Sequence, residues 1–455
     1  MVYTISAQCN VIENIDKSVY WKQILLALTA SLPFYTFGVE TNTLSSSAHS
    51  GHFNGSPSVS WSTTALLLGS IVSPSIYCYF IDKFGRKLGI YTIYLTQGIS
   101  LIPLLLEDNQ INDIMLNVLA GVFSGGLFTV LPIYIREITR NQLRGLNLSF
   151  MMLFTTAGYL MRIAVDLETM IYVMIAMVVL QFVSLFWLLE TPGCLVKLKK
   201  FKEAHISFAA INCLDPDDAV VTYEINALKS ECERAKPKEI LTLIDIIRNQ
   251  IWRDELKIGI VLQTSMVLCG NILFMDEDKS LSQLGPMTYP DGVLVVSSIF
   301  VGSVICFMLI MFVDRKYILT IGHSIMALSM GVLAVFTQSD LTVASLRWLP
   351  VTALIVLIVG YGFVWGLPVI VTVEMLNIEI RATIIAIVYV YSQILKLIRV
   401  HTFQYIEEYM GVYTIFYIFA GINLYGAVFA LFRIPTIKGK TVRQVERQLK
   451  RIPIV

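Results

Sequence analysis

Long apolar segments separated by short polar loops fill most of the chain. A membrane-spanning helix needs about 20 apolar residues to cross roughly 30 Å of hydrocarbon. Segments of this kind lie at residues 22–44, 59–81, 88–106, 114–135, 146–165, 169–189, 257–275, 292–313, 318–337, 349–373, 382–402 and 409–432. The pattern predicts an all-α membrane protein with twelve transmembrane helices in two groups of six.

The composition leads to the same class. Hydrophobic residues make up 56% of the 455 residues and charged residues 15%, and the mean hydropathy is +0.69. A water-soluble globular protein is excluded by these values. The net charge is only +1, and the basic residues lie in short loops between apolar segments and form no patch. We therefore expect no nucleic-acid partner. The seven cysteines are scattered, and no catalytic constellation is present, so we expect no enzyme activity, no metal and no cofactor.

Lysine and arginine gather in the loops on one side of this topology. Short loops rich in these residues stay on the cytosolic side, and they follow spans two, four, eight and twelve. Residues 45–60 and 107–113, on the other side, contain neither. Both termini are therefore expected in the cytosol. Asn54 would then lie outside as a glycosylation candidate, although Pro57 follows the sequon directly and sequons often go unused.

The largest polar segment lies between the two groups of spans. Within residues 190–256, apolar residues recur at helical spacing in 197–208, 218–234 and 240–249, which predicts short cytosolic helices. This linker either latches the two halves together or tethers them passively. The expected divisions are 1–21, 22–189, 190–256, 257–432 and 433–455. We expect no removable signal peptide, because no small-residue cleavage site follows a short apolar run.

Two charge clusters repeat between the halves. The first runs from Asp82 to Lys87 with Glu137 and Arg144 downstream, and the second is Asp314-Arg315-Lys316 with Glu374 and Arg381 downstream. Both glutamate-to-arginine spacings are seven residues. Duplicated halves are typical of transporters in which two bundles rock about a central site. The candidate gate residues are Asp82, Gly85, Arg86, Lys87, Glu137, Arg144, Asp314, Arg315, Glu374 and Arg381.

Opposite charges at the ends of these helices would attract and close a cytosolic gate. If exposed, each pair contributes only about 0–1 kcal/mol, so the network would bias a two-state equilibrium. In the alternative interpretation, the charges only satisfy the positive-inside rule and cap helices. The matched spacing in the two halves favours the gate.

The motifs resemble those of the sugar porter family of the major facilitator superfamily over nearly the whole chain. They are Asp82-x-x-Gly85-Arg86-Lys87, Gly121-x-x-x-Gly125-Gly126, Pro132-x-Tyr134-x-x-Glu137, Arg144-Gly145, Glu190-Thr191-Pro192 and Pro435-x-x-Lys438-Gly439-Lys440-Thr441. Within the family, they are most similar to the insect facilitated trehalose transporters. The resemblance implies the major facilitator fold and a plasma-membrane carrier that moves a small-molecule sugar, trehalose or a hexose. The oligomeric state stays open.

The resemblance is weaker at the substrate site. Asn117, Met152 and Val369 stand where the family usually has Arg, Gln and Trp. A sugar needs hydrogen-bond partners for its hydroxyls and an apolar face for its ring. The candidates that remain are Gln263 and Asn271, about two helical turns apart, Trp365, one turn before Val369 on an unbroken helix, and Gln393. Each has a structural alternative, as an interhelical contact or an interface anchor.

Glu40 is a carboxyl within the first span and therefore a possible proton site. In the family, this carboxyl usually has a cationic partner at the position that Asn117 occupies here. Alternatively, Glu40 lies close enough to the outer mouth to be hydrated and is then no proton site. Lys396 and Arg399 share one helix face in span eleven and either line a wet cavity or extend outward. We expect facilitated diffusion. Proton-coupled symport, transport of a non-sugar organic solute, and a non-transporting nutrient sensor remain alternatives.

Overall fold

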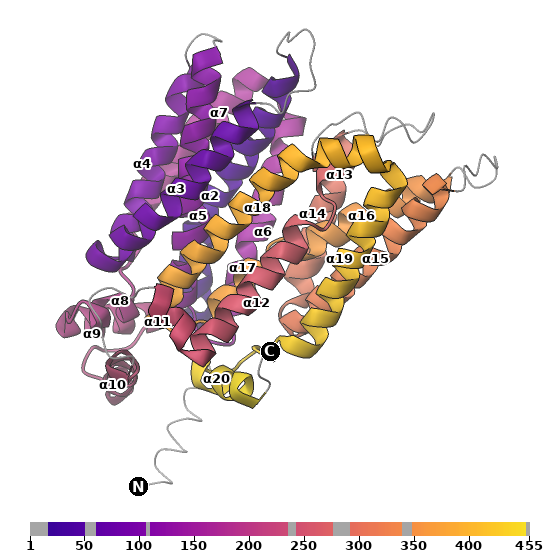
Figure 1. The fold of residues 1–455 in the computed structure, drawn as a ribbon. Coiled ribbons are helices and arrows are strands. Elements are labelled where there is room, and N and C mark those ends of the chain that lie inside the picture. The colour runs from indigo at the N-terminus through magenta and orange to yellow at the C-terminus, as the bar shows by residue number, and fades with distance from the viewer. Residues whose placement is uncertain are drawn as a thin grey trace.

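The protein is described by a computed structural model that covers residues 17–50, 61–105, 110–234, 243–275, 292–338 and 348–451. The regular elements in these ranges are all helices (Figure 1). Asn54, the glycosylation candidate, lies outside the described residues.

The described helices correspond to the predicted spans. In the first half they are α2 (Lys17–Ser50), α3 (Trp61–Phe84), α4 (Arg86–Leu105), α5 (Gln110–Ile138), α6 (Arg144–Ala164) and α7 (Leu167–Ser184). In the second half they are α12 (Gln250–Val267), α13 (Ile272–Met275), α14 (Gly292–Leu309), α15 (Arg315–Gln338), α16 (Trp348–Val364), α17 (Leu367–Met375), α18 (Arg381–Met410) and α19 (Val412–Arg433). In the described ranges, nine spans are long and apolar enough to cross a membrane. The helices α4, α6 and α7 complete the twelve.

The two halves repeat one packing arrangement. In the first half, α3 packs on α5, α2 on α6, and α4 on both α5 and α7. In the second half, α14 packs on α16, α12 on α18, and α15 on both α16 and α19, which are the corresponding helices in chain order. The halves meet where α18 packs on α3 and α14 packs on α6. This pseudo-symmetry is the basis of a fold that can rock about its centre.

Two predicted spans are interrupted in the second half. The seventh span breaks after Val267, where Gly270 has a φ of +97°, a backbone conformation that favours glycine. The tenth span breaks at Trp365 and Gly366, and Pro368 lies in the first turn of α17. The unbroken helices assumed for Asn271 and Trp365 are therefore wrong, since both residues lie at the breaks.

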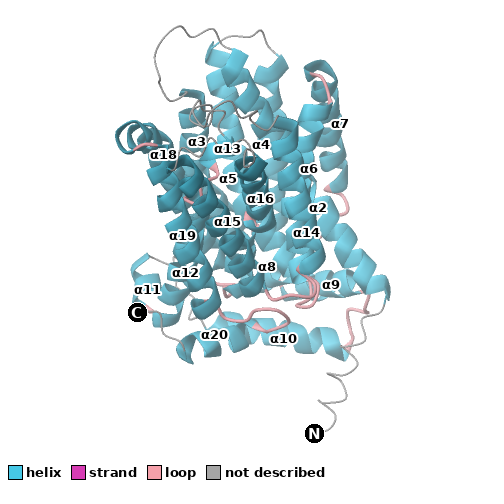
Figure 2. Cartoon of the chain, turned by 90° about the vertical axis from the view of Figure 1, so that its right-hand side faces the viewer, coloured by secondary structure: helices cyan, strands magenta, loops and turns pink. Residues whose placement is uncertain are grey.

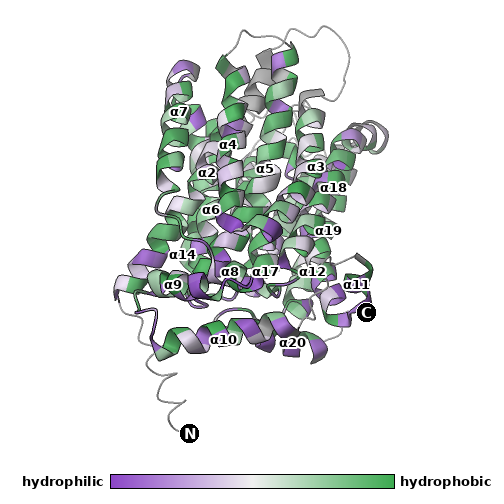
Figure 3. Cartoon of the chain, turned by 90° about the vertical axis from the view of Figure 1, so that its left-hand side faces the viewer, coloured by the Kyte–Doolittle hydropathy of each residue, from purple (hydrophilic) through white to green (hydrophobic). Residues whose placement is uncertain are grey.

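Short helices cover one end of the bundles, which we call the linker end (Figure 2). They are α8 (Pro192–Lys197), α9 (Phe201–Asn212), α10 (Ala219–Arg234), α11 (Leu243–Arg248) and, from the C-terminal part, α20 (Val442–Arg451). α9, α10 and α11 overlap the three predicted linker helices. α20 packs on α12 and α17 and buries Val445 and Leu449. Figure 3 shows hydrophilic residues on α10 and α20, whereas the bundle helices are largely hydrophobic.

Candidate functional site

Glu137 lies at the centre of a buried charge cluster at the linker end. It lies in the last turn of α5. Its carboxylate forms an ion pair with Arg86 at the start of α4 (Nε to Oε2, 3.3 Å) and accepts a hydrogen bond from Arg381 at the start of α18 (Nη1 to Oε1, 3.0 Å). The Thr191 hydroxyl donates to Oε2 at 2.6 Å. Because α18 belongs to the second half of the chain, the Arg381 contact joins the two halves.

A second buried pair repeats this arrangement. Arg315, at the start of α15, contacts Glu374, near the end of α17, at 3.0 Å. Arg136 of the first half donates to the Glu374 carbonyl oxygen at 3.5 Å. Gly145 provides the space for Arg315, since a Cβ atom at this position would collide with the guanidinium group. The second pair is therefore also in contact with the first half.

Because these ion pairs are buried, each contributes a different free energy from the one estimated for exposed pairs in the sequence analysis. The side chains of Arg86, Glu137 and Arg381 are 1%, 3% and 1% exposed. The estimate for exposed pairs therefore does not apply. Removing one partner of a buried pair costs about 3–5 kcal/mol, because an uncompensated buried charge remains. The charge network thus holds the helix ends together more strongly than the sequence predicted.

Glu190 completes the first cluster, although the sequence analysis did not include it among the gate residues. Its carboxylate accepts from the backbone N–H groups of Arg86 (2.9 Å) and Lys87 (3.0 Å), at the first turn of α4, where a helix favours negative charge. Gly85 has a φ of +109°, and a Cβ atom there would meet this carboxylate. Desolvation by burial raises the pKa of Glu190 despite these hydrogen bonds. The signal available in the sequence was the motif Glu190-Thr191-Pro192.

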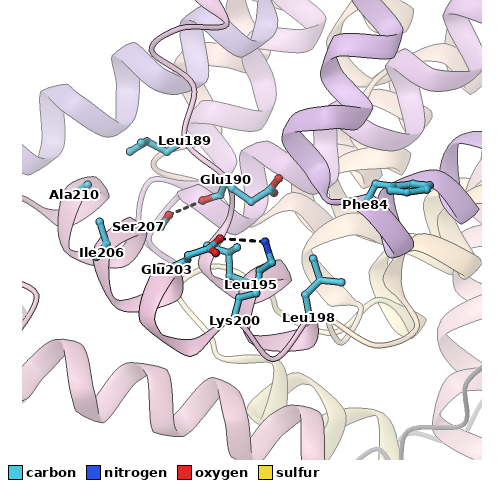
Figure 4. Close-up of a pocket in the computed structure, with 10 residues that line it drawn as sticks. All are labelled: Phe84, Leu189, Glu190, Leu195, Leu198, Lys200, Glu203, Ile206, Ser207 and Ala210. Carbon is cyan, nitrogen blue, oxygen red and sulfur yellow. Dashed lines mark hydrogen bonds and ion pairs between the residues drawn. The ribbon is translucent and has the colours of Figure 1, made fainter.

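A pocket of about 360 Å³ adjoins Glu190 at the linker end. Figure 4 shows that α9 contributes Ser207 and Ile206 to its lining, with Ser207 turned toward the Glu190 backbone. The Ser207 hydroxyl donates to the Glu190 carbonyl oxygen. This contact attaches α9 to the segment that follows α7, next to the charge cluster.

The other candidate gate residues lie at helix ends nearby. Asp82 pairs with Lys197 of α8 at 2.9 Å and with Arg86 at 3.5 Å. Arg144 donates to Asn141 at 2.6 Å. Asp314 accepts from the Lys316 backbone N–H at 3.4 Å, at the start of α15. Asp82 thus links the cluster to the linker helices, while Asp314 has the helix-capping role that the alternative interpretation assigned to these charges.

Trp365 and Gln393 lie close to the interface between the halves. The Trp365 indole donates to Ser303 at 3.4 Å, and its ring lies edge-on to Phe128 of α5 at 6.5 Å. Phe128 also stacks on Tyr389 of α18, with ring centroids 5.9 Å apart. The Gln393 side chain lies beside the Tyr389 hydroxyl, one turn along α18. An aromatic group and an amide therefore come together at mid-depth in the fold.

Gln263 and Asn271 differ in their surroundings. Gln263 is half-buried, and none of the hydrogen bonds found among the described residues involves its side chain. Asn271 donates to the Tyr361 hydroxyl at 3.3 Å and accepts from Arg399. Asn271 therefore joins helices in this structure, whereas the Gln263 amide has no hydrogen-bond partner among the described residues; both stay predictions as substrate ligands.

Glu40 is buried in α2, with 4% of its surface exposed, next to Ser100 of α4. One turn away, Thr36 accepts hydrogen bonds from Gln97 of α4 and Gln181 of α7. The hydrated position considered for Glu40 is therefore not found. Among the described residues, no group of three or more His, Cys, Asp or Glu side chains could hold a metal ion.

The arrangement of helices defines the fold class. A solved structure of the proton:xylose symporter XylE with bound 6-bromo-6-deoxy-D-glucose, a major facilitator superfamily protein, superposes with a TM-score of 0.75 at 17% identity, covering 95% of this chain and 99% of that one. The protein thus has the twelve-helix major facilitator fold. The profile of the family "Sugar (and other) transporter" matches residues 24–449, and the chain belongs to that family.

Curated relatives include insect facilitated trehalose transporters. The one from Drosophila willistoni is 22% identical over 94% of this chain and 51% of its own length. The one from Bombyx mori is 22% identical over 95% of this chain and 88% of its own length. The chain therefore spans about half the length of the first relative and most of the second. The motifs in the sequence predicted both the family and this group of relatives.

Proposed function

We propose that the protein is a transmembrane carrier of a sugar, trehalose or a hexose, that works by alternating access. The ion pair between Glu137 and Arg381 carries this proposal, because it joins the two halves of a duplicated fold at one end. Both relatives are named as trehalose transporters, and the matched structure holds a glucose analogue, which supports the substrate class.

In this proposal, the structure represents the state closed at the linker end. The described contacts between halves include Glu137 with Arg381, the Arg136 contact with Glu374, and Ser124 with Tyr389 at mid-depth. Breaking the charged contacts would release α18 from α5. It would open a path from the linker end to the rings of Phe128, Trp365 and Tyr389, which we call the central aromatic group. A two-state equilibrium of this kind shifts when a solute binds one state better than the other.

We place the protein in the plasma membrane with both termini in the cytosol, since basic residues dominate the loops at the linker end. The divisions at 22–189, 190–256 and 257–432 remain the proposed domains, although α12 begins at Gln250, inside the proposed linker. The linker acts as a latch in this account, because α8 contacts both halves: Lys197 pairs with Asp82 of the first half, and Gly193 lies against Ile378 of the second.

Proton-coupled sugar symport is the second candidate. It is favoured by Glu40, a carboxyl buried inside the first half at 4% exposure. Buried ionisable groups within a membrane are commonly proton or substrate sites. Facilitated diffusion remains our first proposal, because Asn117 stands where a cationic partner for this carboxyl is usual in the family.

Uptake of radiolabelled trehalose and glucose into cells that express the full chain tests the proposal. It should be measured at two external pH values, with Glu137→Gln as the gating variant and Glu203→Gln as its control. Saturable uptake that is independent of pH and falls in Glu137→Gln alone supports a facilitative carrier. Uptake that rises at acidic pH and is lost in Glu40→Gln supports symport. No uptake of either sugar by protein at the cell surface contradicts trehalose and glucose as the solutes.

A further inference from the structure

A lysine that has no acidic partner among the described residues lies halfway along α18. Lys396 is at the middle of this 30-residue helix and is partly exposed. Among the described residues, the charged side chain that acts on Lys396 is Arg399, which is also positive, and no ion pair includes Lys396. An ionisable side chain at membrane depth is costly and is retained where it binds a partner or a substrate.

The helical spacing shows which way Lys396 points. Tyr389, Gln393 and Lys396 are separated by four and three residues, so they share one face of α18. Tyr389 on this face contacts Ser124 and Phe128 of α5, in the other half of the protein. Lys396 therefore lies on the face of α18 that is turned toward the interface between the halves.

The residues on the opposite face of α18 show that the Lys396 side chain does not point outward to the lipid. Ile394 and Ile398 are 42% and 52% exposed and mark the surface of the bundle. At 3.6 residues per turn, Lys396 lies about 160° around the helix from both. The extended, lipid-facing orientation that the sequence left open is thus not the one adopted. The structure favours the other orientation, in which the Lys396 side chain lines the interface between the halves.

Arg399 has a different role from Lys396. Its guanidinium donates to the Val267 carbonyl oxygen at 2.7 Å, at the end of α12, and to the Asn271 side chain. It thereby holds the break in the seventh span. Lys396, in contrast, has no hydrogen-bond acceptor among the described residues. It lies one turn from Gln393 and two turns from the central aromatic group along α18.

We propose that the transported solute is a sugar with one anionic group, a carboxylate or a phosphate, and that Lys396 is its counter-charge. In this arrangement Gln393 binds hydroxyls and Trp365 packs against the sugar ring. The proposal rests on the proposed function, a sugar carrier, and differs from it in the solute: an anionic sugar takes the place of the neutral trehalose or hexose. A positive charge in a site with low-dielectric walls also raises the local concentration of anions before they bind.

The test uses the full chain reconstituted in proteoliposomes, with Lys396→Met, Lys396→Arg and a control, Lys22→Met, near the start of α2. The probes are radiolabelled glucuronate for the carboxylate, glucose 6-phosphate for the phosphate, and glucose and trehalose as neutral sugars. A potassium gradient with valinomycin sets the membrane potential. The solute would carry its charge across while Lys396 stays with the protein, so an inside-positive potential should accelerate uptake of the anion.

We expect saturable uptake of at least one anionic sugar by the wild type, its loss by tenfold or more in Lys396→Met, and its retention in Lys396→Arg and Lys22→Met. Which anionic probe is taken up distinguishes carboxylate from phosphate. Uptake of neutral sugars alone, unchanged in Lys396→Met, overturns this inference while leaving the proposed function intact. Uptake of none of the four probes by correctly reconstituted protein overturns both.

Discussion

Arg381 and Glu137 lie 3.0 Å apart although 244 positions separate them in the chain. Arg381 begins α18 in the second half, and Glu137 lies in the last turn of α5 in the first. Glu137 also binds Arg86 of its own half, so one carboxylate serves both an internal and a cross-half contact. Loss of this carboxylate would remove the shared partner of two buried guanidinium groups, so we expect Glu137 to be a sensitive position of the linker end.

The buried pair of the second half should contribute more to stability than an exposed pair. We expect Glu374→Gln to lower the free energy of unfolding in detergent by about 3–5 kcal/mol, because Arg315 would keep an uncompensated buried charge. Glu203→Gln is the matched control: its partner Lys200 lies at 3.4 Å, but both side chains are more than half exposed. It should cost less than about 1 kcal/mol. Equal losses in the two variants would refute the role assigned to burial.

A methyl group at Gly366 should force the halves apart. A Cβ atom at Gly366, in the break of the tenth span, would collide with Met152 of α6 in the first half. Overpacking of this kind costs about 1–3 kcal/mol, so Gly366→Ala should lower the thermal unfolding midpoint. The control is Gly331→Ala in α15, where nothing lies within 4 Å of the added Cβ; alanine is the better helix former there by about 1 kcal/mol. An unchanged midpoint in Gly366→Ala would show that the interface is looser than described.

Trp365 should be required for solute binding. Its ring packs on Phe128 at the interface between the halves, and aromatic contacts of this kind contribute about 0.5–1.5 kcal/mol beyond buried area. We expect Trp365→Ala to reduce solute uptake about tenfold, the effect of about 1.4 kcal/mol. Trp348→Ala is the control, since that side chain is 61% exposed at the start of α16. If both variants transport like the wild type, Trp365 is only a packing residue.

The sequence predicted the helices well because the membrane imposes a strong and local pattern. Each of the twelve apolar segments overlaps described helix, and the predicted starts of the fourth, fifth and eleventh spans lie within four residues of those observed. The motif resemblance also predicted the fold. It could not show that Arg381 crosses to Glu137, because which oppositely charged residues pair depends on how the halves pack.

The substrate site was harder to predict. Helical periodicity assumes an unbroken helix, and the breaks at Gly270 and Gly366 redirect Asn271 and Trp365. Asn271 also proved to be engaged by Arg399 and Tyr361, contacts between residues distant in sequence. Gln263, Asn271, Trp365 and Gln393 remain predictions as substrate ligands, and Glu40 remains one as a proton site.

The most direct test of the central claim uses Cys78, whose thiol donates to the Ala382 carbonyl oxygen across the two halves at 3.2 Å. With the other six of the seven cysteines replaced by alanine, the rate of Cys78 alkylation by a maleimide reports how often the linker end opens. We predict slow alkylation in this background and in Glu203→Gln, and alkylation faster by about tenfold or more in Glu137→Gln, since the variant loses about 3–5 kcal/mol of buried pairing. Equal rates in all three proteins would contradict the claim that Glu137 holds the halves together.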